Sequence, residues 1–357
     1  MENILLTGLD ISKKVSGGVV THVENILNSQ LSNLYNYSYQ KIEYKGKNIF
    51  QRILCLLEDY KNLLIKMKKY KFKVIHINTS IYLVSLMRIL PAIIIAKGLH
   101  MKVILQLHGG RIDNIDKEYR NVILYFLKKC DKVLILCSEQ AKQFYKYDSC
   151  FTKLIEVIPN YINIKEFPRM EVERENRISF LFLGSIVKEK GVYELIKAIS
   201  LLNKDEEEKV RFIFVGDGRD LIKVKKLCYE YKINKIVEFT GFLRNRQKRE
   251  ILQKSDVLIL PSWSEAFPYV ALEAMAYKMP IISTPAGAMK ELVIQGKNGF
   301  LIPYKNVEAL VEKIKFYINN PEEIIKMGEY NYEILVDNYI MENQGVDKFS
   351  KIYNSLV

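Results

Sequence analysis

The chain of 357 residues is long enough for two domains of ordinary size, and 49% of its residues are hydrophobic, which excludes a disordered or low-complexity protein. Its net charge of +13 is uneven: residues 1–165 carry 25 Lys and Arg against 13 Asp and Glu, and residues 166–357 carry 29 against 28. Six lysines lie between Lys61 and Lys73. This asymmetry indicates either an anionic partner for the N-terminal half or a solvated basic face.

The five cysteines form no C-x-x-C pair, which favours reduced thiols of a cytosolic protein over a disulfide framework or a zinc site. The chain begins directly with a strand pattern, without a basic segment and cleavage site, so we expect no signal peptide. The most apolar segment, 81–99, is interrupted by Arg88, Pro91 and Lys97. It therefore predicts two buried pieces and no membrane span.

Short runs of β-branched residues, bounded by Gly, Asn, Ser or Pro, alternate with segments of helical period along the chain. In chain order the expected strands are 4–8, 74–78, 103–109, 133–138, 155–160, 178–185, 211–218, 237–241, 257–262, 280–284 and 299–303. Continuous apolar runs among them suit strands buried on both faces, as in parallel sheets covered by helices. The pattern predicts an α/β protein of two doubly wound, Rossmann-like domains.

Changes in composition predict the domain limits. Between 160 and 177, Glu, Arg and Asn replace the apolar runs, so we place an N-terminal domain at 1–165 and a second domain at 166–340. The closing segment, 341–357, predicts a helix that carries Phe349, Ile352 and Tyr353. Segments 32–48 and 111–119 show no recognisable pattern, and we expect them to be loops of the N-terminal domain.

Residues suited to ligand binding follow the expected strands repeatedly. In open α/β sheets, ligands bind at the carboxyl ends of the strands. The residues that fall there are Gly17 and Gly18, His108, Gly184, Gly216 and Gly218, Gly241, and Glu265. Since both halves supply such loops, we expect the site in a cleft between the two domains.

The segment 261–276 is the most informative of these. From 266 to 277 the only charged residue is Glu273, and a carboxylate in apolar surroundings needs a cation or hydrogen-bond donors. Pro268 suits the first turn of a helix, which would leave the amides near Ala266, Phe267 and Tyr269 available to an anion. A phosphate at these amides and a sugar hydroxyl at Glu273 would meet both demands. Alternatively, Glu273 is an ordinary helix glutamate that reaches solvent.

Three further positions have a functional and a structural interpretation. Gly17 and Gly18 let a backbone approach a phosphate or form a plain turn, and they match neither G-x-G-x-x-G nor a P-loop, which argues against dehydrogenases and NTPases. His108 contacts a sugar or caps its loop. Lys190 neutralises a pyrophosphate or is exposed like its neighbour Lys188. The remaining histidines, His22, His76 and His100, suit helix or strand positions without a metal cluster.

Together these segments resemble the retaining, nucleotide-sugar-dependent glycosyltransferases of the GT-B fold, the group 1 or family 4 type. The resemblance covers almost the whole chain. The residues that carry it are Phe182-Leu-Gly-Ser-x-x-x-Glu-Lys190-Gly191, Val215-Gly-Asp-Gly218, Phe239-Thr-Gly-Phe-Leu243, Glu265-x7-Glu273-Ala-Met-Ala and Gly299-Phe-Leu-Ile-Pro303.

The resemblance implies a role for each matching residue. Glu273 would accept hydrogen bonds from ribose hydroxyls, and Lys190 would offset the charge of the leaving diphosphate, as a metal does in other transferases. Donor sugar and diphosphate would be held by Glu265 and the segment Ala266, Phe267, Pro268 and Tyr269, in which every residue except the proline has an amide N–H to donate. The other implied contacts are His108 with the donor sugar, Gly17 and Gly18 with the diphosphate and acceptor, and Gly241, Phe242 and Leu243 with the base. The final helix would pack back across the N-terminal domain.

The sequence departs from the family pattern at three positions. Ser185 stands where the family commonly has an arginine that meets the diphosphate, so one cation is missing or comes from elsewhere. Ala266 replaces the usual glycine after the first glutamate, and Tyr161 follows Pro159-Asn160 where the family has glycine.

The sequence thus predicts a cytosolic hexosyltransferase of bacterial surface polysaccharide synthesis. It would move a sugar, with retention, from a UDP-sugar to a glycan or lipid-linked acceptor, without metal or other cofactor, and its basic half would contact anionic membrane peripherally. A catalytically silent GT-B partner subunit, suggested by Ser185, is the alternative. A nucleic-acid-binding protein is a weaker one, because no reading motif accompanies the basic charge and the 23 tyrosines.

Overall fold

The computed structural model describes residues 1–11, 17–43, 45–168 and 176–357. The chain forms two compact units, Met1–Asn163 with Ile340–Val357, and Ile164–Tyr339. The division at 163 lies close to the limit expected at 165, and the closing segment belongs to the first unit. Part of the expected boundary segment, 169–175, lies outside the described residues.

The first unit is built on a six-stranded parallel sheet in the order β2-β1-β3-β4-β5-β6. Its strands are β1 Glu2–Gly8, β2 Tyr35–Lys41, β3 Val74–Ile81, β4 Lys102–Gly110, β5 Lys132–Ile135 and β6 Ile155–Val157. Five of them lie where the sequence predicts strands. The sixth, β2, corrects the loop expected at 32–48. Its alternating tyrosines and polar residues suit an edge strand beside β1, which needs no continuous apolar run.

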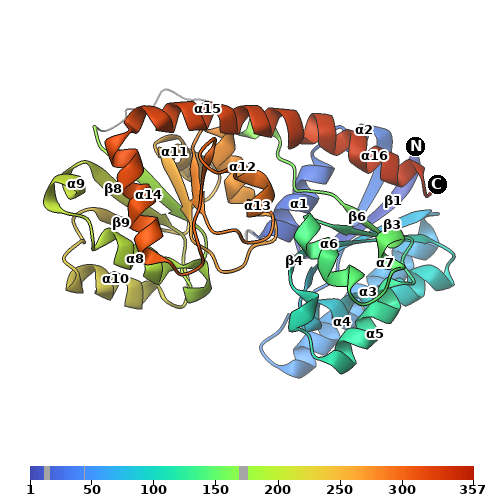
Figure 1. The fold of residues 1–357 in the computed structure, drawn as a ribbon. Helices are drawn as coiled ribbons and strands as arrows, with labels where there is room; N and C mark the ends of the chain where they lie inside the picture. The colour runs from blue at the N-terminus through green and yellow to red at the C-terminus, as the bar shows by residue number, and fades with distance from the viewer. Residues whose placement is uncertain (12–16, 44, 169–175) are drawn as a thin grey trace. The chain divides into compact units, whose positions relative to one another are not determined.

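Helices cover both faces of this sheet (Figure 1). α3 Ile49–Lys69, α4 Leu83–Gly98 and α5 Lys117–Leu127 share one hydrophobic core with one face. α1 Gly18–Leu27 and α16 Val346–Asn354 share a second core with the other face. The shorter helices are α2 Leu31–Leu34, α6 Ser138–Tyr145 and α7 Phe151–Leu154. Segment 111–119, expected as a loop, contains a 3₁₀ turn at Ile112–Asn114 and the beginning of α5.

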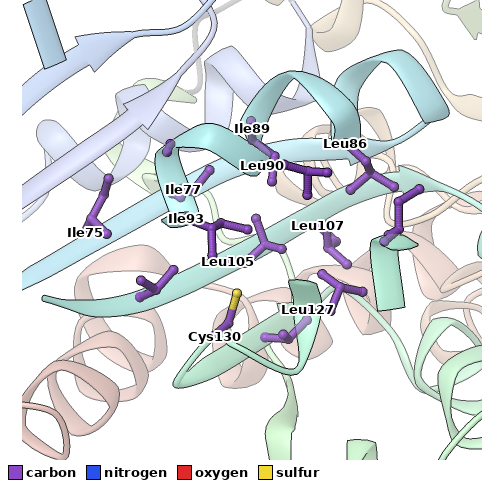
Figure 2. Packing of buried hydrophobic residues seen from close by; sticks show 14 of the residues in the cluster. Ile75, Ile77, Leu86, Ile89, Leu90, Ile93, Leu105, Leu107, Leu127 and Cys130 are labelled. Atoms are coloured by element: carbon purple, nitrogen blue, oxygen red, sulfur yellow. The ribbon is translucent and has the colours of Figure 1, made fainter. Parts of the chain in front are cut away.

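Helix α4 corrects the prediction for 81–99. The segment is not two buried pieces, because one helix continues through Pro91. Figure 2 shows the reason: Leu86, Ile89, Leu90 and Ile93 of α4 lie against the strands β3 and β4. Burial of this face compensates for the backbone hydrogen bond that proline removes. Among the helices in the described part of the chain, none is long and apolar enough to cross a membrane.

The closing segment forms a π-helical turn, Met341–Gly345, followed by α16. Phe349 and Tyr353 are fully buried on the face of the sheet opposite to α4. The Tyr353 hydroxyl lies 2.9 Å from Nδ1 of His76 in β3, and Nε2 of His76 donates to Oε1 of Gln106 in β4 at 3.0 Å. These bonds connect α16 to the middle of the sheet.

Three buried histidines of this unit predict acid sensitivity. Burial lowers the pKa of His22 to about 4 and that of His76 to about 3, and it holds the pKa of His108 well below its ordinary value. The folded chain keeps these rings neutral, whereas the unfolded chain binds protons below about pH 6.5. The free energy of unfolding should therefore be highest above pH 6.5 and fall as the pH drops toward 4, by about 3 kcal/mol for His22 alone.

Thermal unfolding measured from pH 7.5 to 4 tests this expectation. The midpoint should fall steadily below pH 6.5, and His22→Asn should reduce the slope. His100→Asn is the matched control, because His100 is exposed in a turn with φ 57°, where asparagine fits well. A midpoint that stays constant over this range would contradict the prediction.

The second unit is also a six-stranded parallel sheet, in the order β12-β11-β10-β7-β8-β9. Its strands are β7 Ile178–Leu183, β8 Val210–Val215, β9 Val237–Gly241, β10 Val257–Leu260, β11 Ile281–Ser283 and β12 Gly299–Leu301. All six were predicted. Successive residues such as Phe180 and Leu181 of β7 are both buried, which shows that both faces of the sheet are covered.

The helices of this unit are α8 Val192–Ile199, α9 Lys204–Glu208, α10 Leu221–Glu230, α11 Asn245–Gln253, α12 Tyr269–Ala276, α13 Met289–Leu292, α14 Val307–Asn319 and α15 Pro321–Asn338. The sheet grows outward in both directions from the neighbouring strands β7 and β10. β8 and β9 follow on one side of this pair, and β11 and β12 on the other. The carboxyl ends of β7 and β10 thus form the switch point, where open α/β sheets bind ligands.

Candidate functional site

An ion pair lies at this switch point. Lys190 follows β7, in the 3₁₀ turn Lys188–Lys190, and Glu265 follows β10. Lys190 Nζ lies 2.5 Å from Glu265 Oε1, with 30% of the lysine side chain and 11% of the glutamate side chain exposed. Lys190 is therefore neither buried nor a free surface lysine. The fold brings together two residues that are far apart in the sequence and that the family resemblance selects.

Glycines allow the two loops to pack closely. Gly191 has φ 70°, and a Cβ there would lie 2.1 Å from the carbonyl oxygen of Pro261. Nearby, the amide of Trp263 donates to the carbonyl of Glu189 at 2.9 Å. Gly287 has φ 54°, and a Cβ there would lie 2.2 Å from the carbonyl oxygen of Glu265. Larger residues would displace these loops, so both glycines hold the ion pair in place.

Helix α12 begins beside this pair. It starts at Tyr269, with Pro268 as its N-cap and not in its first turn as expected. Pro268 makes no side-chain cap hydrogen bond. The carbonyl of Ala266 accepts from the amide of Ala288 at 2.8 Å, which fixes the approach to the helix. The first turn of a helix carries a partial positive charge that suits an anion.

Glu273 does not reach solvent, so its interpretation as an ordinary surface glutamate is wrong. The residue is 5% exposed in the middle of α12. Its Oε1 lies 2.6 Å from Nζ of Lys248 in α11. Its Oε2 is buried, and it has no hydrogen-bond partner among the described residues. A charged oxygen in that position is an acceptor that a ligand hydroxyl could use.

Sequence reasoning missed Lys248. The residue lies in a strongly basic helix, where each cation alone suggests a solvated face. The sequence nevertheless contains a signal, since the apolar residue Leu252 comes one helical turn after Lys248. In the structure Leu252 is fully buried. Residues four apart share a face of a helix, so Lys248 lies on the inner side of α11.

Tyr277 is a second residue that sequence reasoning missed. It follows Glu273 by one helical turn, and its hydroxyl is buried without a hydrogen-bond partner among the described residues. Burial raises the pKa of Tyr277, the positive charge of Arg249 lowers it, and the charge of Glu273 raises it further. Near Glu273 there are thus an unused acceptor, an unused hydroxyl and two cations, Lys248 and Arg249.

The remaining predicted residues of this unit lie at neighbouring strand ends. Gly241 ends β9 with φ 74°, and the ring of Phe242 is half exposed with the Arg244 guanidinium 4.8 Å from its centre. Leu243 is partly buried. Ser185 is exposed in the loop after β7.

The first unit holds His108, Gly17 and Gly18. His108 ends β4 and is buried. Because Asn78 donates its Nδ2 to the Thr7 carbonyl, its Oδ1 faces Nε2 of His108 at 2.9 Å and accepts from it. Nδ1 of His108 is then a lone-pair acceptor, and among the described residues it has no hydrogen-bond partner. The lowered pKa of His108 keeps the ring neutral, so it can accept a hydrogen bond from a hydroxyl but cannot act as a cation.

Gly17 is the N-cap of α1 and Gly18 its first residue. A Cβ at either position would meet nothing within 4 Å. Crowding within the described residues therefore does not require glycine at these positions, and the backbone there is open to approach. The preceding residues, 12–16, lie outside the described part of the chain.

Two solved structures define the class of this fold. Sucrose-phosphate synthase from Thermosynechococcus elongatus matches 100% of this chain and 99% of its own, with a TM-score of 0.83 at 18% identity. Anabaena HepE in complex with UDP matches 98% of this chain and 100% of its own, with a TM-score of 0.74 at 15% identity. The protein has the GT-B fold, with two Rossmann-like domains, and the predicted fold class is confirmed.

Sequence relatives identify the family. The family described as glycosyl transferases group 1 matches residues 163–334. An uncharacterized glycosyltransferase of Methanocaldococcus jannaschii is 30% identical over 331 residues, which cover 89% of each chain. A Bacillus subtilis protein named for teichuronic acid biosynthesis is 27% identical over 242 residues, 63% of this chain and 57% of its own. The chain belongs to the glycosyltransferases, as the resemblance predicted, and its residues 163–334 match the group 1 family.

Proposed function

We propose that this glycosyltransferase moves a hexose from a UDP-sugar to a glycan or lipid-linked acceptor, with retention of configuration, in bacterial surface polysaccharide synthesis. Relatives named for teichuronic acid, for colanic acid and for a cps region support the pathway class. Similar folds solved with UDP, and with UDP-glucose, support the donor class. The observation that carries the proposal is the buried Oε2 of Glu273, an acceptor that ribose hydroxyls would satisfy.

The chemistry of the proposed donor site follows from its charges. When the donor bond breaks, negative charge develops on the leaving diphosphate, and a cation already in place stabilises it. Lys190 provides that cation, and Glu265 fixes the direction of its Nζ. The amide N–H groups of Ala266, Phe267 and Tyr269, on either side of Pro268 at the beginning of α12, would bind the phosphates, and Glu265 would bind the donor sugar.

We propose the remaining contacts with the base, the diphosphate and the sugar from the positions of the residues. The exposed Phe242, with Gly241 and Leu243, would meet the base of the nucleotide. Ser185 would contribute its hydroxyl where an arginine is usual. For the first unit we propose that His108 accepts a hydrogen bond from a sugar hydroxyl, and that Gly17 and Gly18 present open backbone to a phosphate.

A donor-hydrolysis screen over UDP-, GDP- and ADP-sugars, without acceptor, tests the function. We expect slow hydrolysis of a UDP-sugar, with the other nucleotides weaker. Absence of hydrolysis with every donor, together with intact UDP binding, would favour the catalytically silent partner subunit. A salt-sensitive gel shift with DNA or RNA would instead revive the nucleic-acid alternative.

We expect donor hydrolysis to need no metal ion, and the same assay tests this. Because Lys190 supplies positive charge at the leaving diphosphate, EDTA should leave the hydrolysis rate unchanged. Among the described residues there is no group of three His, Cys, Asp or Glu that could hold a metal ion. Complete loss of turnover in EDTA, restored by Mn²⁺ or Mg²⁺, would contradict the role given to Lys190.

We also propose peripheral contact of the first unit with an anionic membrane surface, which would present a lipid-linked acceptor. The charge balance of residues 1–165 supports it. Six lysines lie in the second half of α3 or just after it, namely Lys61, Lys66, Lys68, Lys69, Lys71 and Lys73. In this part of the helix Leu63 and Met67 are core residues, and Ile65 is exposed.

A further inference from the structure

The first half of α3 exposes apolar side chains. Residues 49–57, which we name the α3 tip, include five large hydrophobic residues that are 46–69% exposed, namely Ile49, Phe50, Ile53, Leu54 and Leu57. In the second half of the same helix, Tyr60, Leu63 and Met67 are buried in the core of the first unit. The helix therefore begins beyond the edge of the core that its later turns cover.

The five exposed residues form one surface. At 100° per residue they fall within an arc of about 140° around the helix axis. Single exposed hydrophobic residues are common on soluble proteins, but five in nine residues on one side of a helix form a continuous apolar patch. Such a patch favours contact with another apolar phase.

The charges near the α3 tip indicate what that phase is. Lys45 and Lys47 are exposed just before the helix, and Arg52 lies within the tip. No acidic residue occurs from 45 to 57, and the first exposed one after the tip is Glu58, about 40° beyond the edge of the arc. Apolar side chains bordered by cations match a membrane interface that contains anionic lipids. A second copy would place the same cations against each other, which disfavours self-association.

The start of α4 also exposes apolar side chains. Tyr82, Val84 and Met87 are exposed there, and α3 and α4 cover the same face of the sheet, with the Tyr60 hydroxyl donating to the carbonyl of Arg88. In Figure 1 these two helices run along the same side of the first unit. Both helices follow parallel strands, so both begin at the carboxyl ends of those strands. The patch thus lies at the ligand-binding edge of this sheet.

We propose that the α3 tip inserts its apolar residues into the interface of an anionic membrane while Lys45 and Lys47 bind lipid headgroups. This inference rests on the proposed transfer to a lipid-linked acceptor, and it goes further in naming the surface and the mode of attachment. Electrostatic contact alone would disappear at high salt. Insertion of five apolar side chains predicts that part of the binding persists.

Sedimentation of the full-length chain with vesicles tests the inference. Vesicles of phosphatidylcholine, with and without phosphatidylglycerol, are compared at low and high salt. The wild type should bind the anionic vesicles and keep part of that binding at high salt. Phe50→Ser with Leu57→Ser should reduce binding at least tenfold at both salt concentrations. Lys45→Gln with Lys47→Gln should reduce only the preference for anionic lipid.

A matched control carries the same change at other exposed hydrophobic residues. Ile222 and Ile325 lie in the second unit and are 83% and 68% exposed, so Ile222→Ser with Ile325→Ser should bind vesicles like the wild type. The Phe50→Trp variant places a tryptophan in the α3 tip. A blue shift of its fluorescence emission on vesicle binding reports insertion directly. Donor hydrolysis in solution should be normal in the serine variants, which shows that they are folded.

Three results would overturn the inference. The first is that the wild type does not bind vesicles, and the second is that Phe50→Ser with Leu57→Ser binds them as well as the wild type does. The third is a wild-type dimer in analytical ultracentrifugation that the same variant loses. The last would mean that a second copy covers the tip. Failure of donor hydrolysis in every protein, with vesicle binding intact, would instead remove the proposed function and leave the membrane surface in place.

Discussion

Replacing Lys190 with alanine should slow turnover by about 100-fold or more, because one preorganised charge at a developing anion is typically worth that much. In the structure its Nζ lies 2.5 Å from Glu265 Oε1, at the switch point of the second sheet. The loss should appear mainly in kcat of donor hydrolysis, since the charge that Lys190 meets increases as the diphosphate leaves. Steady-state kinetics with a UDP-sugar measure this.

Lys188→Ala is the matched control. Lys188 lies in the same turn but is exposed, and its Nζ is 5.7 Å from the centre of the Trp263 ring. Its removal should change kcat less than threefold. Because Lys190→Ala leaves Glu265 without its cation, thermal unfolding of both variants should be compared, and Lys190→Arg should recover part of the rate. Normal turnover in folded Lys190→Ala would show that Lys190 only stabilises the loop.

Replacing Glu273 with alanine should weaken UDP binding by about 1.5–3 kcal/mol, the scale of hydrogen bonds to a charged group. That range corresponds to about 10- to 150-fold in Kd. The reason is the buried Oε2, which has no hydrogen-bond partner among the described residues and which the ribose hydroxyls would satisfy. Titration calorimetry with UDP measures the change.

An analogue that lacks the ribose hydroxyls distinguishes this role from a structural one. Glu273→Ala should cost little affinity for 2′,3′-dideoxy-UDP, whereas a collapsed site would lose both ligands. Lys248→Met should also weaken UDP binding, because it leaves the buried carboxylate without its cation. Glu250→Ala serves as control, because this glutamate of α11 is paired with Arg246 and its side chain is 38% exposed. Wild-type affinity for UDP in Glu273→Ala would rule out the ribose contact.

Most of the fold was predictable because parallel strands buried on both faces have continuous apolar runs. In the second unit β7, β8 and β10 carry that pattern, and in the first unit β1 and β5 do. β2 does not, since an edge strand pairs on one side only and its tyrosines alternate with polar residues. α4 was divided wrongly at Pro91, because the local preference of proline was given more weight than the packing of the whole helix on β3 and β4.

The sequence by itself determined the residue types of the candidate site: the isolated Glu273 and the lysine in a strand-to-helix loop. Tertiary structure alone decided which residues meet. Lys190 and Glu265 pair because β7 and β10 are neighbours, and strand order depends on long-range packing that local patterns do not encode. Lys248, one of three Lys and Arg residues of α11, reaches Glu273 because of where α12 lies. The α3 tip is exposed because the core ends before it, and this boundary is set by the assembled sheet and not by the helix itself.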